Sequence, residues 1–136
     1  MNAAPNVFSP AKLGPITLRN RTIKAATFEA RTPGALVSDD LIAFHRAMAA
    51  GGVGMTTMAY CAVSQGGRTD DSALWLRPEA VPGLRRLTEA VHAEGGKIAL
   101  QILHAGRYAY HPLAVAPSGS RSPISPFRAR GLTGWG

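Results

Sequence analysis

The chain has 136 residues, of which 46% are hydrophobic and 17% are charged; this composition is typical of one globular domain and not of a disordered segment. Fifteen basic and eight acidic residues give a net charge of +7, but no basic run exceeds Arg85-Arg86 and no zinc-finger or RNA-binding pattern is present, so we expect no nucleic-acid partner. No stretch approaches the roughly 18 consecutive apolar residues of a membrane span and no secretory signal is visible, so we expect no membrane partner.

The N-terminal segment predicts a hairpin followed by a strand. Residues 7–19 predict the hairpin, because apolar residues flank a turn at Gly14-Pro15. Residues 22–27, with the sequence TIKAAT, are apolar and partly β-branched. They predict a short buried strand.

The next segment predicts a helix and a second strand. Ser38 is a good N-cap residue, and Asp39 and Asp40 follow it in the first turn, where the helix dipole favours negative charge. Gly51-Gly52 ends the helical pattern. Residues 53–60 then predict the second strand.

The same order repeats once. Pro82 suits the first position of a second helix, which Gly95-Gly96 ends. Residues 97–103, with the sequence KIALQIL, predict a third strand. Residues 104–136 form the loop that follows, and we expect no regular element longer than one turn within residues 112–136.

The alternation of apolar strands with amphipathic helices predicts an α/β fold with a parallel sheet and right-handed crossovers. Three parallel strands leave sheet edges unpaired, and a complete (β/α)8 barrel needs at least ~200 residues. The chain therefore reads as one incomplete domain over residues 1–136, the N-terminal part of a (β/α)8 TIM barrel. Residues 22–103 would hold its first three barrel strands.

A polar group of residues follows the third predicted strand. The segment LQILHAGR, Leu100 to Arg107, places a glutamine, a histidine, a glycine and an arginine at the carboxyl end of an apolar strand. Barrel ligands bind at the carboxyl ends of the strands. The segment therefore predicts a ligand site.

Four segments in order resemble the Old Yellow Enzyme family of FMN-dependent NAD(P)H:flavin oxidoreductases, nearest the branch that contains 2,4-dienoyl-CoA reductases and NADH oxidases. They are FSPAKLGPITLRNR, AGGVGMTTMAYCAVSQGGR, VHAEGGKIALQILHAGR and APS, and they lie within residues 7–118. The resemblance implies FMN as the cofactor and NAD(P)H as the hydride donor. It implies a small-molecule substrate with an activated C=C bond, such as an enone or an enoyl thioester.

The resemblance also implies which residues contact FMN. Gln101 would point its amide at the pyrimidine edge of the flavin, which shows both donors and acceptors; the alternative is a strand-end glutamine bonded to backbone. Ala26 and Thr27, and less directly Phe28, would run along the ring; for Ala25-Ala26 the alternative is simple tight packing.

The resemblance aligns Tyr60 with a small flavin-contacting residue of the family. Either the ring of Tyr60 turns away and only its backbone contacts FMN, or its hydroxyl enters the site. Cys61, next to it, is expected to be a small buried residue and not a reactive thiol.

The polar residues of two loops have plainer interpretations. We expect His104 to fix its loop as a neutral residue, and not to be the catalytic acid. We expect Arg107 to pair with a carboxylate or with backbone carbonyls. The segment SQGGRTDDS, residues 64–72, lacks the P-loop pattern and predicts a surface loop near the site.

The family's catalytic residues and its grip on the FMN phosphate belong to later strands that this chain lacks, so no catalytic residue is assigned. The single cysteine cannot hold an iron–sulfur cluster, and we expect no metal site. It fits a reducing cytoplasm. Two hypotheses stand: an N-terminal part of an FMN-dependent oxidoreductase, or a catalytically incomplete chain that associates with other chains through its sheet edges. Under both, we expect an oligomer or a part of a longer chain.

Overall fold

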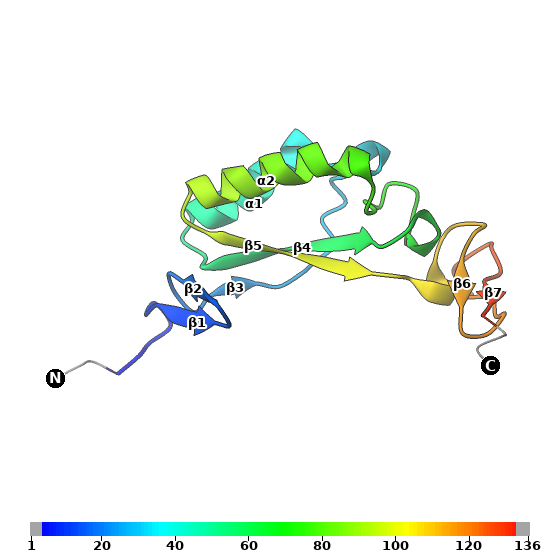
Figure 1. The fold of residues 1–136 in the computed structure, drawn as a ribbon, viewed down its shortest axis with the longest axis horizontal. Coiled ribbons are helices and arrows are strands. Elements are labelled where there is room, and N and C mark those ends of the chain that lie inside the picture. The colour runs from blue at the N-terminus through cyan, green and yellow to red at the C-terminus, as the bar shows by residue number, and fades with distance from the viewer. Residues whose placement is uncertain (1–3, 133–136) are drawn as a thin grey trace.

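The computed structural model describes residues 4–132, which contain two helices longer than one turn and three small sheets (Figure 1). The central sheet is parallel with the order β3-β4-β5. The elements, in chain order, are β1 (Ala11–Leu13), β2 (Ile16–Leu18), β3 (Ile23–Lys24), α1 (Asp39–Ala50), β4 (Met55–Ala62), α2 (Val81–Ala93), β5 (Lys97–Leu103), β6 (Val115–Ala116) and β7 (Arg130–Gly131). Within this range no helix is long and apolar enough to cross a membrane.

Both long helices lie on one face of the central sheet (Figure 1). The core fills the space between them and the sheet, because the apolar sides of the helices and of β4 and β5 meet there. Its buried members include Leu41, Met58, Leu74, Leu87 and Val91. The helices leave the opposite face of the sheet uncovered.

The predicted elements are observed with small shifts. The hairpin pairs β1 with β2 around Gly14-Pro15. Ser38 caps α1, since its side chain accepts a hydrogen bond from the Leu41 N–H. The third strand has the predicted bounds, Lys97–Leu103.

The first predicted strand, residues 22–27, is wrong in length, because β3 spans only Ile23–Lys24. The ammonium group of Lys24 explains where pairing stops. It donates hydrogen bonds to the carbonyl oxygens of Ala25 (3.0 Å) and Thr57 (3.3 Å), so these carbonyls accept from a side chain instead of continuing the ladder between β3 and β4.

The second predicted strand, residues 53–60, lies two residues further along as Met55–Ala62. Val53 belongs to the turn after α1, where its N–H bonds to the Met48 carbonyl. At the other end Cys61 and Ala62 still pair with β5.

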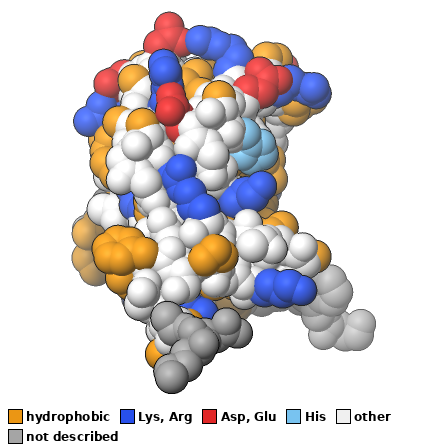
Figure 2. All heavy atoms as spheres, turned by 90° about the vertical axis from the view of Figure 1, so that its left-hand side faces the viewer, with side chains coloured by type: hydrophobic (Ala, Val, Ile, Leu, Met, Phe, Trp, Pro, Cys, Tyr) orange, Lys and Arg blue, Asp and Glu red, His pale blue; other side chains and the backbone are white. Residues whose placement is uncertain are grey.

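Arg19, just after β2, connects the amino end of β4 with the ends of both helices. Its guanidinium donates to the carbonyl oxygens of Val53 and Ala49, and to that of Glu94 at 2.8 Å. Figure 2 shows the end of the molecule nearest the hairpin, with acidic side chains only in the upper part, over the helices. One arginine thus ties three elements together at the amino end of the sheet.

The loop after β5 contains no element longer than one turn within residues 112–132, as predicted for that part of the chain. It holds one short 3-10 helix, Gly106–Tyr108, and the two-residue strands β6 and β7, which pair in parallel. Residues 133–136 of the predicted loop lie outside the described residues.

Candidate functional site

A bulge in β4 brings two candidate residues to the same place on adjacent strands. Met58 pairs with Leu100 and Cys61 pairs with Ile102, so two residues of β4, Ala59 and Tyr60, oppose the single residue Gln101 of β5. Tyr60 has a positive φ of 54°, which a non-glycine residue adopts only at a strained position. Bulges re-aim side chains and are common next to active sites.

Gln101 lies on the sheet face that the helices leave uncovered. Ile98 and Leu100 pack against the core below the helices, and side chains alternate along a strand. Gln101 therefore points the opposite way, and it is exposed. Within residues 4–132 its amide has no hydrogen-bonding partner, so it is free to bind a ligand.

The segment after β3 runs beside the bulge. The Phe28 and Tyr60 rings stack, with centroids 5.2 Å apart and planes inclined by 22°. Thr27 is exposed and Ala26 is half-buried. The structure therefore brings Phe28 and Tyr60 into contact and places Ala26 and Thr27 on the segment that leads to them.

A buried carboxylate links that segment to β4. The Glu29 side chain is only 4% exposed. One oxygen accepts from the Ala59 N–H at 3.2 Å, and the other pairs with Lys24 Nζ at 3.1 Å. Glu29 thereby fixes the backbone of the bulge one residue before Tyr60.

A histidine on α1 completes this polar cluster. His45 is fully buried; its Nδ1 lies 2.8 Å from the Thr56 hydroxyl, and its Nε2 lies 3.5 Å from Glu29 Oε1. Burial, and then the positive charge of Lys24, lower the pKa of His45 to about 4, so the ring is neutral near pH 7. His45 Nδ1 shares a hydrogen bond with the Thr56 hydroxyl, whereas Nε2 is buried without a hydrogen-bond partner among the described residues.

The glycine-containing segment after β4, residues 64–72, is only partly the surface loop that its sequence predicts, because its middle is buried while Gln65 and Asp71 are exposed. Gly66, Gly67 and Arg68 are buried. A Cβ on Gly67 would lie 2.6 Å from the His104 ring, and one on Gly66 would lie 2.6 Å from the Leu113 carbonyl oxygen. The glycines thus let this segment pack directly against the loop after β5. The polar sequence of the segment gives no local signal of this burial.

His104 fixes its own loop, as expected. Its Nδ1 accepts a hydrogen bond from the Gly106 N–H at 3.0 Å. The expectation for Arg107 is wrong. Its guanidinium donates to the Tyr108 hydroxyl and stacks on that ring, with 4.8 Å between the guanidinium carbon and the ring centroid, and it pairs with neither a carboxylate nor a backbone carbonyl of the described residues.

Cys61 is fully buried in the core, as expected. Burial raises the pKa of its thiol to about 11. The thiol therefore stays protonated near pH 7 and is not a nucleophile.

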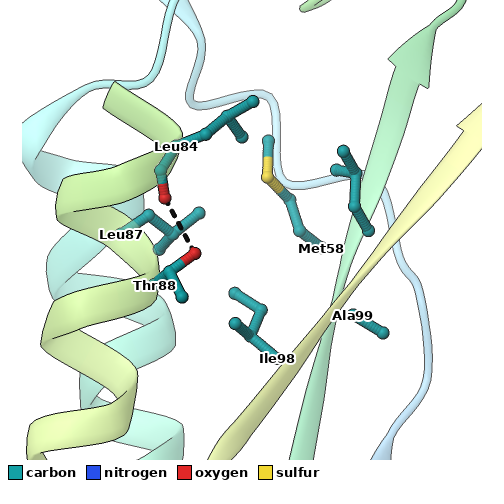
Figure 3. A pocket seen from close by; sticks show the side chains of 7 residues that line it. Met58, Leu84, Leu87, Thr88, Ile98 and Ala99 are labelled. Carbon is teal, nitrogen blue, oxygen red and sulfur yellow. Dashed lines mark hydrogen bonds between the residues drawn. The ribbon is translucent and has the colours of Figure 1, made fainter. Parts of the chain in front are cut away.

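An apolar pocket of about 140 Å³ lies between α2 and the central sheet (Figure 3). Its lining includes Met58, Leu84, Leu87 and Ile98, with Thr88 bonded to the Leu84 carbonyl. No charged side chain lines it, and it lies on the helix side of the sheet, away from Gln101 and the uncovered face. It is a packing gap beside α2 and not the candidate site.

The sequence interpretation missed Lys24, Glu29 and Thr56 as one cluster with His45. The available signal was a lysine inside the apolar stretch TIKAAT with a glutamate five residues later. A buried charge is stable only when it is paired, so Lys24 required a nearby carboxylate.

Comparison with known proteins identifies the fold of which this sheet is a part. The chain is 53% identical, over 133 residues, to the 4,4'-dithiodibutanoate disulfide reductase of Rhodococcus erythropolis, covering 95% of this chain and 33% of that protein. It superimposes on morphinone reductase in complex with tetrahydroNAD with a TM-score of 0.83 and 26% identity, covering 95% of this chain and 41% of the other. For the Old Yellow Enzyme homologue from Zymomonas mobilis the TM-score is 0.80 with 27% identity, covering 94% and 40%.

These matches confirm the α/β fold as the N-terminal part of an Old Yellow Enzyme barrel. The chain spans about one third of the length of its Rhodococcus relative. The family model for NADH:flavin oxidoreductases and NADH oxidases matches residues 6–131, nearly the whole chain. The chain therefore belongs to the NADH:flavin oxidoreductase / NADH oxidase family.

Proposed function

We propose that this chain supplies one wall of the FMN site of an NAD(P)H-dependent ene-reductase in the cytoplasm. The FMN held here would supply hydride transfer from NAD(P)H to the β-carbon of an activated alkene, such as an enone or an enoyl thioester, and a proton would add to the α-carbon. The observation that carries the proposal is the position of Gln101 opposite the bulge of β4, at the carboxyl end of a parallel sheet, where barrel ligands bind.

The residues at this edge fit a flavin. The free amide of Gln101 offers both a donor and an acceptor, which the pyrimidine edge of a flavin requires. Ala26 and Thr27 are small enough for a flat ring to approach the backbone after β3. Glu29 would hold Ala59 and Tyr60 in place, so that this wall is formed before a ligand arrives.

A second function follows from the open sheet. Within the described residues β3 and β5 each have one neighbouring strand, and Ile23 and Ile102 on these outer strands are 47% and 58% exposed. Unpaired edges and exposed apolar side chains favour association. The chain would then act as a binding unit that pairs with other chains and has no catalytic activity of its own.

A chimera tests the first function. Residues 4–132 replace the matching segment of the Rhodococcus erythropolis disulfide reductase, whose 53% identity makes the exchange conservative. We expect the purified chimera to be yellow, with the same FMN content per chain as the unaltered relative, and to oxidise NAD(P)H in the presence of an enone. A folded chimera that retains no FMN, while the relative does, would contradict the proposal.

A further inference from the structure

The C-terminal part of the chain carries positive charge without any negative side chain. No acidic residue follows Glu94, and the described loop after β5 contains Arg107, Arg121, Arg128 and Arg130. By contrast, Arg31 before α1 pairs with Asp40, and Arg46 on α1 pairs with Glu94. None of the four loop arginines forms an ion pair within residues 4–132.

Three of these arginines share one surface. Arg121 and Arg128 are direct partners in an antiparallel bridge, which places their Cβ atoms about 5 Å apart. Ala129 is buried, whereas Arg128 and Arg130 are exposed on either side of it. In an extended strand this alternation puts Arg128 and Arg130 on the same face.

The backbone holds two of the guanidinium groups in place. Arg121 donates through Nε to the Ser125 carbonyl oxygen at 3.3 Å, and Arg128 donates through Nε to the Gly119 carbonyl oxygen at 2.8 Å. Their Nη atoms have no partner among the described residues. Like charges directly opposite one another destabilise a strand pair, so this pair would be stabilised by an anion that binds to the free Nη groups.

The surface lies at the carboxyl-end side of the central sheet, the same end as the candidate flavin site. β6 and β7 lie beyond the carboxyl ends of β4 and β5 (Figure 1). Two backbone hydrogen bonds tie the loop to this edge, from the Tyr110 N–H to the Arg68 carbonyl and from the Ala105 N–H to the Gly67 carbonyl. A ligand that reaches Gln101 from the open side could extend over the loop toward the arginines.

We propose that Arg121, Arg128 and Arg130 form a binding site for the phosphate groups of a soluble nucleotide. Planar guanidinium groups match phosphate oxygens in pairs, and three of them suit one or two phosphates. The inference rests on the proposed function, because the nucleotide would place its reactive end over the flavin. A long polyanion such as nucleic acid fits less well, because basic residues elsewhere are scattered or paired.

The test is equilibrium dialysis of the purified 136-residue chain, without flavin, against adenosine 2′,5′-bisphosphate, with adenosine as the uncharged control. We expect saturable binding of the bisphosphate that weakens with added salt, and no retention of adenosine. Arg128→Gln and Arg130→Gln should each weaken binding by about tenfold, the loss of one charge-assisted contact. Arg128→Lys, which keeps the charge but not the planar group, should fall between.

Arg85→Gln on α2 is the matched control, since it removes the same charge from an exposed residue outside the loop. It should leave binding unchanged. Arg130→Gln is the variant least expected to disturb folding, because the Arg130 side chain has no partner within the described residues. A loss of binding in this variant would therefore report on the site and not on misfolding. The proposal is overturned if the bisphosphate does not bind saturably, or if Arg85→Gln weakens binding as much as Arg128→Gln.

The proposal is also overturned if a single-stranded oligonucleotide binds more tightly than the bisphosphate and if Arg85→Gln and Arg128→Gln weaken that binding equally. That result would indicate diffuse electrostatic attraction of polyanions and not a phosphate site. The dialysis contains no flavin. Its failure would therefore leave the FMN proposal standing, and loss of FMN from the chimera would leave the phosphate result standing.

Discussion

The Glu29 carboxylate accepts a hydrogen bond from the Ala59 N–H at 3.2 Å, which joins the segment after β3 to the bulge of β4. The same carboxylate neutralises Lys24 at 3.1 Å. One buried acid therefore fixes two of the chain segments that form the proposed flavin wall, the segment after β3 and the bulge of β4. The wall is held by a polar contact and not only by the ladder, which stops at Lys24.

Removing this acid should loosen the bulge. Glu29→Ala leaves the Ala59 N–H without its acceptor and Lys24 without its partner carboxylate, and we expect a loss of about 3 kcal/mol in stability. The site-specific measurement is amide hydrogen exchange, which should speed up at Ala59 and Tyr60. Glu79→Ala, at an exposed residue, is the control. Unchanged protection of the Ala59 amide in Glu29→Ala would show that the contact does not hold the bulge.

The buried imidazole predicts a pH dependence of stability. The pKa of His45 is lowered from 6.5 to about 4 in the folded chain. Between these values the unfolded chain takes up a proton that the folded chain does not, so stability is lost as the pH falls from 6.5 toward 4, by about 3 kcal/mol from this group.

Thermal unfolding at a series of pH values checks this dependence. His45→Gln removes the titrating group and should flatten the profile between pH 6.5 and 4, even if the variant is less stable throughout. An equally steep profile in His45→Gln would assign the loss to other groups.

Several features followed from the sequence because they depend on local signals. Ser38 caps α1 as its position before two aspartates predicts, and the apolar run Lys97–Leu103 is β5. Local patterns cannot give partners that are distant in the chain. The burial of Gly67 depends on the His104 ring, 37 positions later in the chain. The short length of β3 depends on the hydrogen bond that the Lys24 ammonium group donates to the Thr57 carbonyl oxygen.

The same limit applies to the candidate site. The family resemblance implied that Gln101 and Tyr60 both contact FMN, but not that the bulge would place them opposite one another. The stacking of Tyr60 on Phe28 could not be predicted either. It depends on the positive φ of Tyr60, a strained backbone conformation that cannot be inferred from the residue type.

Arg19 should contribute strongly to stability. Arg19→Ala would leave the carbonyls at the ends of α1 and α2 and at the start of β4 without their charged donor, with an expected loss of about 2–4 kcal/mol. Thermal unfolding followed by circular dichroism measures the change. The neighbouring exposed residue gives the control, Arg21→Ala, which should shift the midpoint little. Similar shifts of the unfolding midpoint in both variants would show that Arg19 contributes no more to stability than an exposed arginine.

Gln101→Ala in the chimera should weaken FMN retention or slow flavin reduction. The flavin would lose one hydrogen bond, worth ~0.5–1.5 kcal/mol, which corresponds to a change of about 2- to 12-fold. Gln65→Ala, the only other glutamine of the chain, is exposed and serves as the control. If the flavin affinity and the rate of flavin reduction of Gln101→Ala match those of the unaltered chimera, Gln101 does not contact the flavin.

The central claim is that this chain is one wall of a barrel and needs further strands to bind flavin and act. Sedimentation velocity of the isolated chain, with its absorbance spectrum recorded on the same sample, tests it most directly. Unpaired edges at β3 and β5 and an uncovered sheet face predict association into species larger than 14.3 kDa, without flavin absorbance. A compact monomer of 14.3 kDa that retains FMN and reduces an enone with NADPH would contradict the account.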